Sequence, residues 1–171
     1  MENTKPQSIL ITGCSSGIGY TAAHMLHKRG WQVFASARDA AAVERLKKEG
    51  LNAVQLDLNE TDSIRMALDW VLKQTGGTLD ALFNNGAFAI PAALEDLSRV
   101  ALAYQIDTGL LGWHELTMAV LPVMRAQGHG RIVNTGSVMG LSAMRFRGAY
   151  CTTKHALEGW SDVLRLELTG T

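Results

Sequence analysis

A tyrosine and a lysine, Tyr150 and Lys154, stand four residues apart near the carboxyl end of the 171-residue sequence. On a helix this spacing puts both side chains on one face. A phenol has an ordinary pKa of about 10, and a nearby ammonium stabilises the phenolate and lowers that pKa toward the range useful for proton transfer. Ser137 lies thirteen residues before Tyr150, and its hydroxyl can hydrogen-bond a carbonyl oxygen. The three residues predict acid–base chemistry at a carbonyl group, although the tyrosine and lysine alone would more often be structural.

A second group of residues lies near the amino end, in the stretch ITGCSSGIGYTAA. Gly13, Gly17 and Gly19 separate a short apolar run from a helical pattern, with the spacing G-x-x-x-G-x-G. The N–H groups and partial positive charge of a helix N-terminus bind phosphate, and glycines let the backbone approach it closely. Ser15 and Ser16 add hydroxyl donors. The stretch predicts a nucleotide-binding loop; the competing interpretation is a helix start that merely needs glycines.

The second apolar run ends in VFASARD, which bears on the choice of nucleotide. Sites that prefer NAD place an acidic side chain here to bind the ribose 2′-hydroxyl. Within this run no carboxylate precedes Arg38. The guanidinium of Arg38 can pair with a phosphate in bidentate fashion. Asp39 follows directly and is explained if it caps the next helix. We therefore expect NADP to be preferred over NAD, while NAD stays possible; a solvated surface arginine is the alternative.

Short apolar runs alternate with helical patterns along the chain, and these are the elements that must position the candidate residues. The runs predict five strands, at 8–12, 32–36, 53–56, 79–83 and 131–135. The helical spacing predicts helices at 17–29, 39–48, 61–74, 97–127 and 148–168, with Thr61 as an N-cap and a kink or break at Pro122. Apolar strands separated by helices are typical of a parallel sheet covered on both faces. We expect one α/β domain, residues 1–171, with a doubly wound parallel sheet.

Composition argues against several classes of protein. Sixteen basic and sixteen acidic residues give a net charge of zero, so neither nucleic acid nor an anionic membrane is expected as a partner. Residues 1–10 lack the pattern of a signal peptide, and no apolar run reaches the roughly 18 residues of a membrane span. Cys14 and Cys151 match no metal-ligand spacing, so no metal site is expected. A cytoplasmic protein with free thiols is the expectation.

Several motifs occur in a fixed order. T-G-x-x-x-G-I-G spans Thr12–Gly19, Asp57-Leu58 follows the third strand, Asn84-Asn85 follows the fourth, and Ser137 precedes the Y-x-x-x-K motif. Together they resemble the short-chain dehydrogenase/reductase family over essentially the whole chain. The resemblance implies a Rossmann-like fold with sheet order 3-2-1-4-5. It also implies an oxidoreductase that transfers a hydride between a nicotinamide cofactor and a carbonyl or alcohol substrate.

The roles of individual residues follow from this resemblance alone. Tyr150 would be the acid–base catalyst, Lys154 its tuning residue and a ribose ligand, and Ser137 would position the carbonyl. Asp57 would lie by the adenine and Asn85 near the cofactor ribose. The other cofactor-binding residues implied are Gly13, Ser15, Ser16, Gly17, Ile18, Gly19, Arg38, Leu58, Asn84 and Gly86. Within the family, NADP-dependent members acting on aldehydes, ketones, retinoids or steroids are the most similar, and a homo-dimer or tetramer is implied.

The sequence departs from the family pattern at three places. Gly86-Ala87 reverses the usual order of alanine and glycine, and Gly109 stands where the family commonly has an asparagine that helps hold a water chain to the lysine. Family members also continue beyond the last predicted helix, so we expect a C-terminally incomplete chain whose fifth strand is a sheet edge. The alternative function is thus a catalytically impaired nucleotide-binding or interaction module, or a fragment of a longer enzyme. A sugar-nucleotide epimerase or dehydratase also uses Y-x-x-x-K, but its glycine spacing usually differs.

Overall fold

The computed structural model describes residues 6–170. Residues 1–5 and Thr171 lie outside the described residues. The expected domain includes all of them, and residues 1–5 also belong to the stretch that was compared with signal peptides. The strands are β1 (Ser8–Ile11), β2 (Gln32–Ala37), β3 (Asn52–Gln55), β4 (Ala81–Asn84) and β5 (Arg131–Asn134). The helices are α1 (Gly17–Lys28), α2 (Ala40–Lys48), α3 (Thr61–Thr75), α4 (Arg99–Ile106), α5 (Gly112–Gln127) and α6 (Gly148–Glu167).

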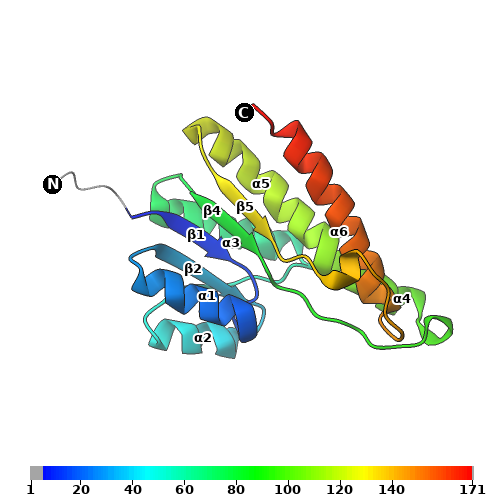
Figure 1. The fold of residues 1–171 in the computed structure, drawn as a ribbon. Coiled ribbons are helices and arrows are strands. Elements are labelled where there is room, and N and C mark those ends of the chain that lie inside the picture. Colours follow the sequence, from blue (N-terminus) through cyan, green and yellow to red (C-terminus); the bar gives the residue numbers. More distant parts are fainter. Residues whose placement is uncertain (1–5, 171) are drawn as a thin grey trace.

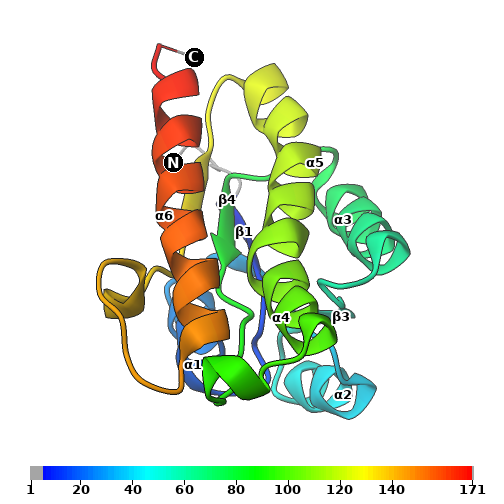
Figure 2. The ribbon, with the colours of Figure 1, turned by 90° about the vertical axis from the view of Figure 1, so that its right-hand side faces the viewer.

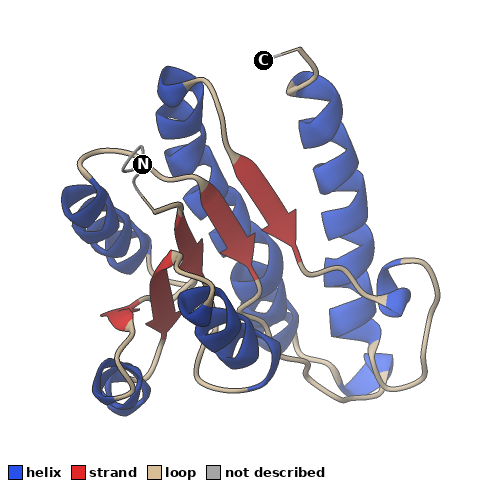
Figure 3. Cartoon of the chain, turned by 60° about the vertical axis from the view of Figure 1, so that its left-hand side comes forward, coloured by secondary structure: helices blue, strands red, loops and turns tan. Residues whose placement is uncertain are grey.

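The strands form one parallel sheet in the order β3-β2-β1-β4-β5 (Figure 1). The doubly wound sheet and its predicted order are confirmed. Helices lie on both sides of the sheet, as Figure 3 shows. Within the described residues, none of the helices combines the length and apolar character that crossing a bilayer requires.

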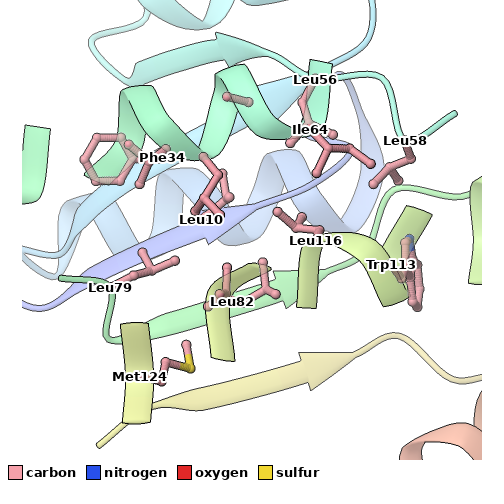
Figure 4. Close-up of a cluster of buried hydrophobic side chains, with 14 of the residues drawn as sticks. Leu10, Phe34, Leu56, Leu58, Ile64, Leu79, Leu82, Trp113, Leu116 and Met124 are labelled. Carbon is pink, nitrogen blue, oxygen red and sulfur yellow. The ribbon is translucent and has the colours of Figure 1, made fainter. Parts of the chain in front are cut away.

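Alternate residues of the central strands pack into two separate hydrophobic cores, one on each face of the sheet, as expected for strands buried on both faces. Leu10, Phe34 and Leu82 are paired across three strands and pack against α3 and α5 (Figure 4). Ile11 and Val33 point the other way, toward α1 and α2. Because both sets are buried, β1 is fixed from both faces, and the loop at its carboxyl end starts from a rigid base.

The sheet is less covered at β5. This strand forms the edge, as predicted, and only Ile132 packs against the core that α3 and α5 share. Val133 faces the other side and is 52% exposed. A groove of about 1330 Å³ lies between β5, α5 and α6 and is lined by residues including Leu121, Met124, Ile132 and Leu164. The two ends of the sheet therefore differ in how completely they are packed.

The long helical region expected over 97–127 is present at 99–127, but it contains a π-helical turn that was not predicted. A π-helical turn, Asp107–Leu111, joins α4 to α5, and the two helices follow one another along one line in Figure 2. The break expected at Pro122 does not occur, because α5 continues through that residue. Pro122 lies on the exposed side of the helix, where water can satisfy the carbonyl that a proline leaves without its N–H partner.

The two predicted caps have different outcomes. Asp39 caps α2, since its Oδ1 accepts a hydrogen bond from the Ala41 N–H at 3.2 Å. Thr61 is not the N-cap of α3, because Glu60 holds that position and Thr61 is the first helical residue. The Thr61 hydroxyl instead donates to Glu115 Oε2 on α5 at 3.2 Å, a tertiary contact that the local sequence does not reveal.

Candidate functional site

The glycine loop begins at the carboxyl end of β1 and packs against the loop that follows β4. Gly13 has a φ of +71°, and a Cβ added there would lie 2.4 Å from Gly86 Cα. A Cβ at Gly19 would lie 2.5 Å from Gly13 O. Neither position has room for a side chain, so the glycines at 13 and 19 are required by close packing of backbone on backbone.

Thr12 joins the two loops through its side chain. Its hydroxyl oxygen accepts hydrogen bonds from the backbone N–H groups of Asn85 and Gly86, both at 2.9 Å. In return, Asn85 Nδ2 donates to Thr12 O at 3.0 Å and to Gly13 O at 3.3 Å. The amide of Asn85 therefore holds the glycine loop in place. Thr12 was named at the sequence level only as part of the motif, and no local signal identified this role.

The predicted cofactor residues of this loop differ in how they are placed. Ser15, Ser16 and Ile18 are exposed around the first turn of α1, and Ser16 occupies its N-cap position without a side-chain hydrogen bond. Gly17 has a φ of +62° and nothing within 4 Å of where a Cβ would lie. The free N–H groups of this helix N-terminus thus face open space beside a fixed loop, which is the arrangement that binds phosphate.

Other predicted cofactor residues lie at the same edge of the sheet, after β2, β3 and β4. Arg38 is exposed, and its Nη1 donates to the hydroxyl of Tyr104 on α4 at 2.7 Å. Asp57 Oδ1 accepts from the Asn59 N–H at 3.0 Å, and Leu58 is buried. Asn84 is also buried, with its side-chain amide donating to Thr117 and Asn134. Its amide thus faces the interior between β4, β5 and α5, while Arg38 stays open to a ligand.

Lys154 is the most unusual side chain in the site, because it is only 1% exposed. Its Nζ donates to Thr135 O at 2.6 Å and lies 5.7 Å from the centre of the Tyr150 ring. Burial lowers the pKa of Lys154 to about 8, and the charge of Glu158 acts in the opposite direction. The structure thus brings Tyr150 and Lys154 together in the first turns of α6, as their spacing predicts.

Ser137 lies in the loop after β5 and is half-buried, like Tyr150. Its Oγ accepts a hydrogen bond from the Met139 N–H at 3.1 Å. The short turn that follows packs tightly on α6, since a Cβ at Gly140 would lie 3.0 Å from Lys154 O. All three candidate catalytic residues are therefore gathered where β5 meets the start of α6, at the same edge of the sheet as the glycine loop. No group of three or more metal-ligating side chains is found among residues 6–170.

Residues 7–171 match the family described as short chain dehydrogenase. The chain belongs to the short-chain dehydrogenase/reductase family. It is 44% identical over 162 residues to the uncharacterized oxidoreductase YbbO of Escherichia coli K12, covering 95% of this chain and 60% of the relative. It is 37% identical over 166 residues to mouse retinol dehydrogenase 16, covering 94% of this chain and 52% of the relative. The chain thus spans little more than half the length of these curated relatives.

A solved structure with the same fold was determined with NADPH. The actinorhodin polyketide ketoreductase with NADPH has a TM-score of 0.91 and 30% identity, covering all of this chain and 68% of that one. The residues present here fit such a group: Gly17 has nothing within 4 Å of where a Cβ would lie, and Ser15, Ser16 and Ile18 around the same helix N-terminus are exposed.

Proposed function

We propose that this chain forms the nucleotide-binding and catalytic part of an NADP-dependent oxidoreductase that acts on the carbonyl or alcohol group of an apolar substrate. The observation that carries this proposal is the buried Lys154 beside Tyr150, at the same edge of the sheet as the glycine loop and the exposed N-terminus of α1. A buried ammonium is costly, and such a group is kept where it has a chemical task. Family membership supplies the reaction type, which is hydride transfer.

In the reduction, the Tyr150 hydroxyl donates a proton to the carbonyl oxygen while the carbon accepts a hydride. The nicotinamide nucleotide supplies that hydride when it is bound. The Lys154 ammonium stabilises the phenolate that forms, and the Ser137 hydroxyl donates a hydrogen bond that holds the carbonyl oxygen toward Tyr150. In the oxidation, the phenolate takes the proton from the substrate alcohol. The balance is one proton and one hydride in each direction.

The preference for NADP rests on Arg38 and on the use made of Asp39. Asp39 caps α2, so its carboxylate is engaged by the Ala41 N–H, whereas the Arg38 guanidinium is exposed. One Nη of Arg38 donates to the Tyr104 hydroxyl, and the other N–H groups of the guanidinium stay available to pair with a 2′-phosphate. Replacing Arg38 with serine should lower affinity for NADPH about tenfold or more and leave NADH affinity unchanged.

The substrate class rests on the surface around Ser137. Val138, Leu141, Met144 and Phe146 are all well exposed in the loop that leads from Ser137 to Tyr150. Exposed apolar side chains that gather in one loop favour an apolar ligand. An aldehyde, a ketone, or a retinoid- or steroid-like alcohol fits this surface, and the relative named retinol dehydrogenase 16 supports the same class.

The decisive experiment combines calorimetry with turnover. NADPH and NADH are titrated into the chain, and NADPH oxidation is followed with a panel of apolar aldehydes and ketones. We expect NADPH to bind more tightly than NADH, and Tyr150→Phe to reduce turnover about 100-fold or more while NADPH binding persists. No binding of either nucleotide would overturn the proposal.

A second candidate function, nucleotide binding without turnover, is favoured by Gly109. The family asparagine expected at this position has no room, because a Cβ at Gly109 would lie 2.7 Å from Thr153 Cγ2. Tight NADPH binding without turnover on any carbonyl of the panel would support this second function over the first.

Assembly and location belong to the same proposal. Leu111, Val163 and Leu166 are exposed on or beside α5 and α6, which supports a homo-dimer or tetramer formed through these helices. Both cysteines are free and buried, which is compatible with a cytoplasmic enzyme. Light scattering during size-exclusion chromatography tests the assembly, and a strictly monomeric mass at micromolar concentration would contradict it.

A further inference from the structure

Trp113 lies directly beneath the charge of Lys154. The Nζ of Lys154 is 4.4 Å from the centre of the indole ring, well inside the roughly 6 Å within which a cation and an aromatic face attract one another. Trp113 is completely buried and Lys154 is 1% exposed, so little water screens this contact. Cation–π attraction is strongest in such desolvated positions.

The ammonium has few other partners. Within residues 6–170, the Lys154 ammonium donates a hydrogen bond to Thr135 O at 2.6 Å. No carboxylate among these residues forms an ion pair with it. Tyr150 and Glu158, on its own helix, are the nearby titratable groups. Thr135 and Trp113 face it from the elements packed against α6, and neither of them titrates. The indole face therefore offsets a large part of the free-energy cost of removing this charge from water.

The indole is held by a hydrogen bond of its own and by the tightly packed backbone that precedes it. Its Nε1–H donates to Gly86 O at 2.9 Å, so the indole is tied to the same loop that packs on Gly13. The preceding residue, Gly112, packs so tightly on the loop after β3 that a Cβ there would lie 2.1 Å from Leu58 O. These contacts leave the indole little freedom to turn or to withdraw from Lys154.

We propose that Trp113 is a positioning residue of the reaction, whose indole face keeps the Lys154 ammonium charged and in place beside Tyr150. The proposal rests on the function given above. It also explains how the lysine is supported in a chain where Gly109 lacks a side chain and Thr153 occupies the space beside it. The same indole connects Lys154 to the loop after β4, so the two halves of the site share one support.

The test measures the charge of Lys154 directly, by NMR titration of lysine ¹³Cε in the free chain. The Lys154 signal is assigned by its loss in Lys154→Arg. Because the indole favours the charged form, Trp113→Leu should lower the Lys154 pKa by about one unit. Trp113→Phe keeps an aromatic ring, although a smaller one, and leaves less room for water than Trp113→Leu does. It should therefore lower the Lys154 pKa by a smaller amount. The two limbs of the pH–rate profile, acid and alkaline, should likewise shift more in Trp113→Leu than in Trp113→Phe.

The matched control is Trp70→Leu, which removes an indole on α3 that packs edge-on against Phe34, whereas Lys154 lies on α6. It should leave the Lys154 pKa unchanged. An unchanged or raised Lys154 pKa in the folded Trp113 variants would overturn the proposal, and Trp113→Phe decides the matter if Trp113→Leu does not fold. The titration needs neither cofactor nor substrate, so it remains informative if the unaltered chain shows no turnover and the proposed function fails.

Discussion

The loops after β1 and β5 both follow a short parallel strand and both reach the same edge of the sheet, yet they are built differently. The loop after β1 is closed by backbone contacts and by Thr12, and added atoms at Gly13 or Gly19 would collide with their neighbours. The loop after β5 instead presents side chains to the surface, with Val138 80% and Leu141 81% exposed.

The difference follows from the position of each strand. β1 lies in the middle of the sheet and is buried on both faces, whereas β5 is the edge and is only partly covered. A loop on the central strand can be fixed by its surroundings and can recognise a ligand through its backbone. A loop on the edge strand presents exposed side chains, and these can change without disturbing the fold. We make four predictions, from the largest expected loss of stability to the smallest: three test this contrast directly, and one compares it with the opposite edge of the sheet.

The largest effect is expected at Gly19. In Gly19→Ala the new Cβ would lie 2.5 Å from Gly13 O and 2.6 Å from Asn85 Nδ2, and the backbone oxygen cannot move aside cheaply. We expect the free energy of unfolding to fall by about 3 kcal/mol and NADPH binding to weaken with it. Urea denaturation and calorimetry measure both. Gly159→Ala is the control, since that exposed helical glycine has open space around it and should gain up to about 1 kcal/mol.

The second effect is expected at Thr12. Thr12→Val keeps the shape of the side chain but leaves the N–H groups of Asn85 and Gly86 without their acceptor. The free energy of unfolding should fall by about 2 kcal/mol, because unsatisfied buried donors are costly. Thr12→Ser retains the oxygen and should recover most of that loss in the same urea experiment. Equal stability of the valine and serine variants would show that the hydroxyl does not join the loops.

A smaller effect of pH is expected at the opposite edge of the sheet. Burial raises the pKa of Asp80, but hydrogen bonds from Ser8 and His129 outweigh it and hold that pKa below its usual range. The hydrogen bond to Asp80 raises the pKa of His129. The carboxylate therefore stabilises the fold above about pH 4 and loses this effect as pH falls below. The imidazolium stabilises it below about pH 6.5 and loses this effect as pH rises through the raised pKa.

Urea midpoints measured from pH 5 to 9 test this pair. The unaltered chain should lose stability on the alkaline side, and His129→Gln should remove that part of the pH dependence. NADPH affinity should be the same in both chains, because Asp80 lies at the start of β4, away from the glycine loop. Identical pH curves for the two chains would contradict the assignment.

The smallest change in stability is expected in the loop after β5. Leu141→Ser should alter the free energy of unfolding by no more than about 0.5 kcal/mol, because Leu141 is exposed. The KM for an apolar carbonyl substrate should nevertheless rise about tenfold, since the leucine would lose its apolar contact with the substrate. Steady-state kinetics with apolar and polar carbonyls of equal size separate the two effects, and an equal change for both would argue against an apolar substrate surface.

The sequence predicted most of the fold because apolar runs and helical spacing are local signals. Strands buried on both faces, such as β1 and β2, leave an uninterrupted apolar stretch that any reader can find. The order of the strands came from the resemblance to a family and not from periodicity. The π-helical turn at Asp107–Leu111 was missed, because the apolar pattern of an α-helix continues through it and a single extra residue per turn leaves no local trace.

The candidate site was predictable only where the spacing itself fixes geometry. Tyr150 and Lys154 had to share a face of α6, and the structure shows them together. The burial of Lys154 depends on Thr135 and Trp113, which lie nineteen and forty-one residues earlier in the chain. From the sequence alone, Trp113 is most simply a packing residue on a helix, since nothing in its neighbours along the sequence indicates the cation above its ring.

The burial of Lys154 also makes it a reporter of opening. Lys28, Lys47, Lys48 and Lys73 are exposed, whereas Lys154 presents almost no surface to solvent. Amine-acylating reagents react only with an accessible, uncharged amine, so in the native protein they modify the exposed lysines and spare this one. Slow acylation of Lys154 therefore measures how often α6 separates from α5 and the loop after β5, and a ligand that holds these parts together slows that reaction by the factor by which it lowers the open population.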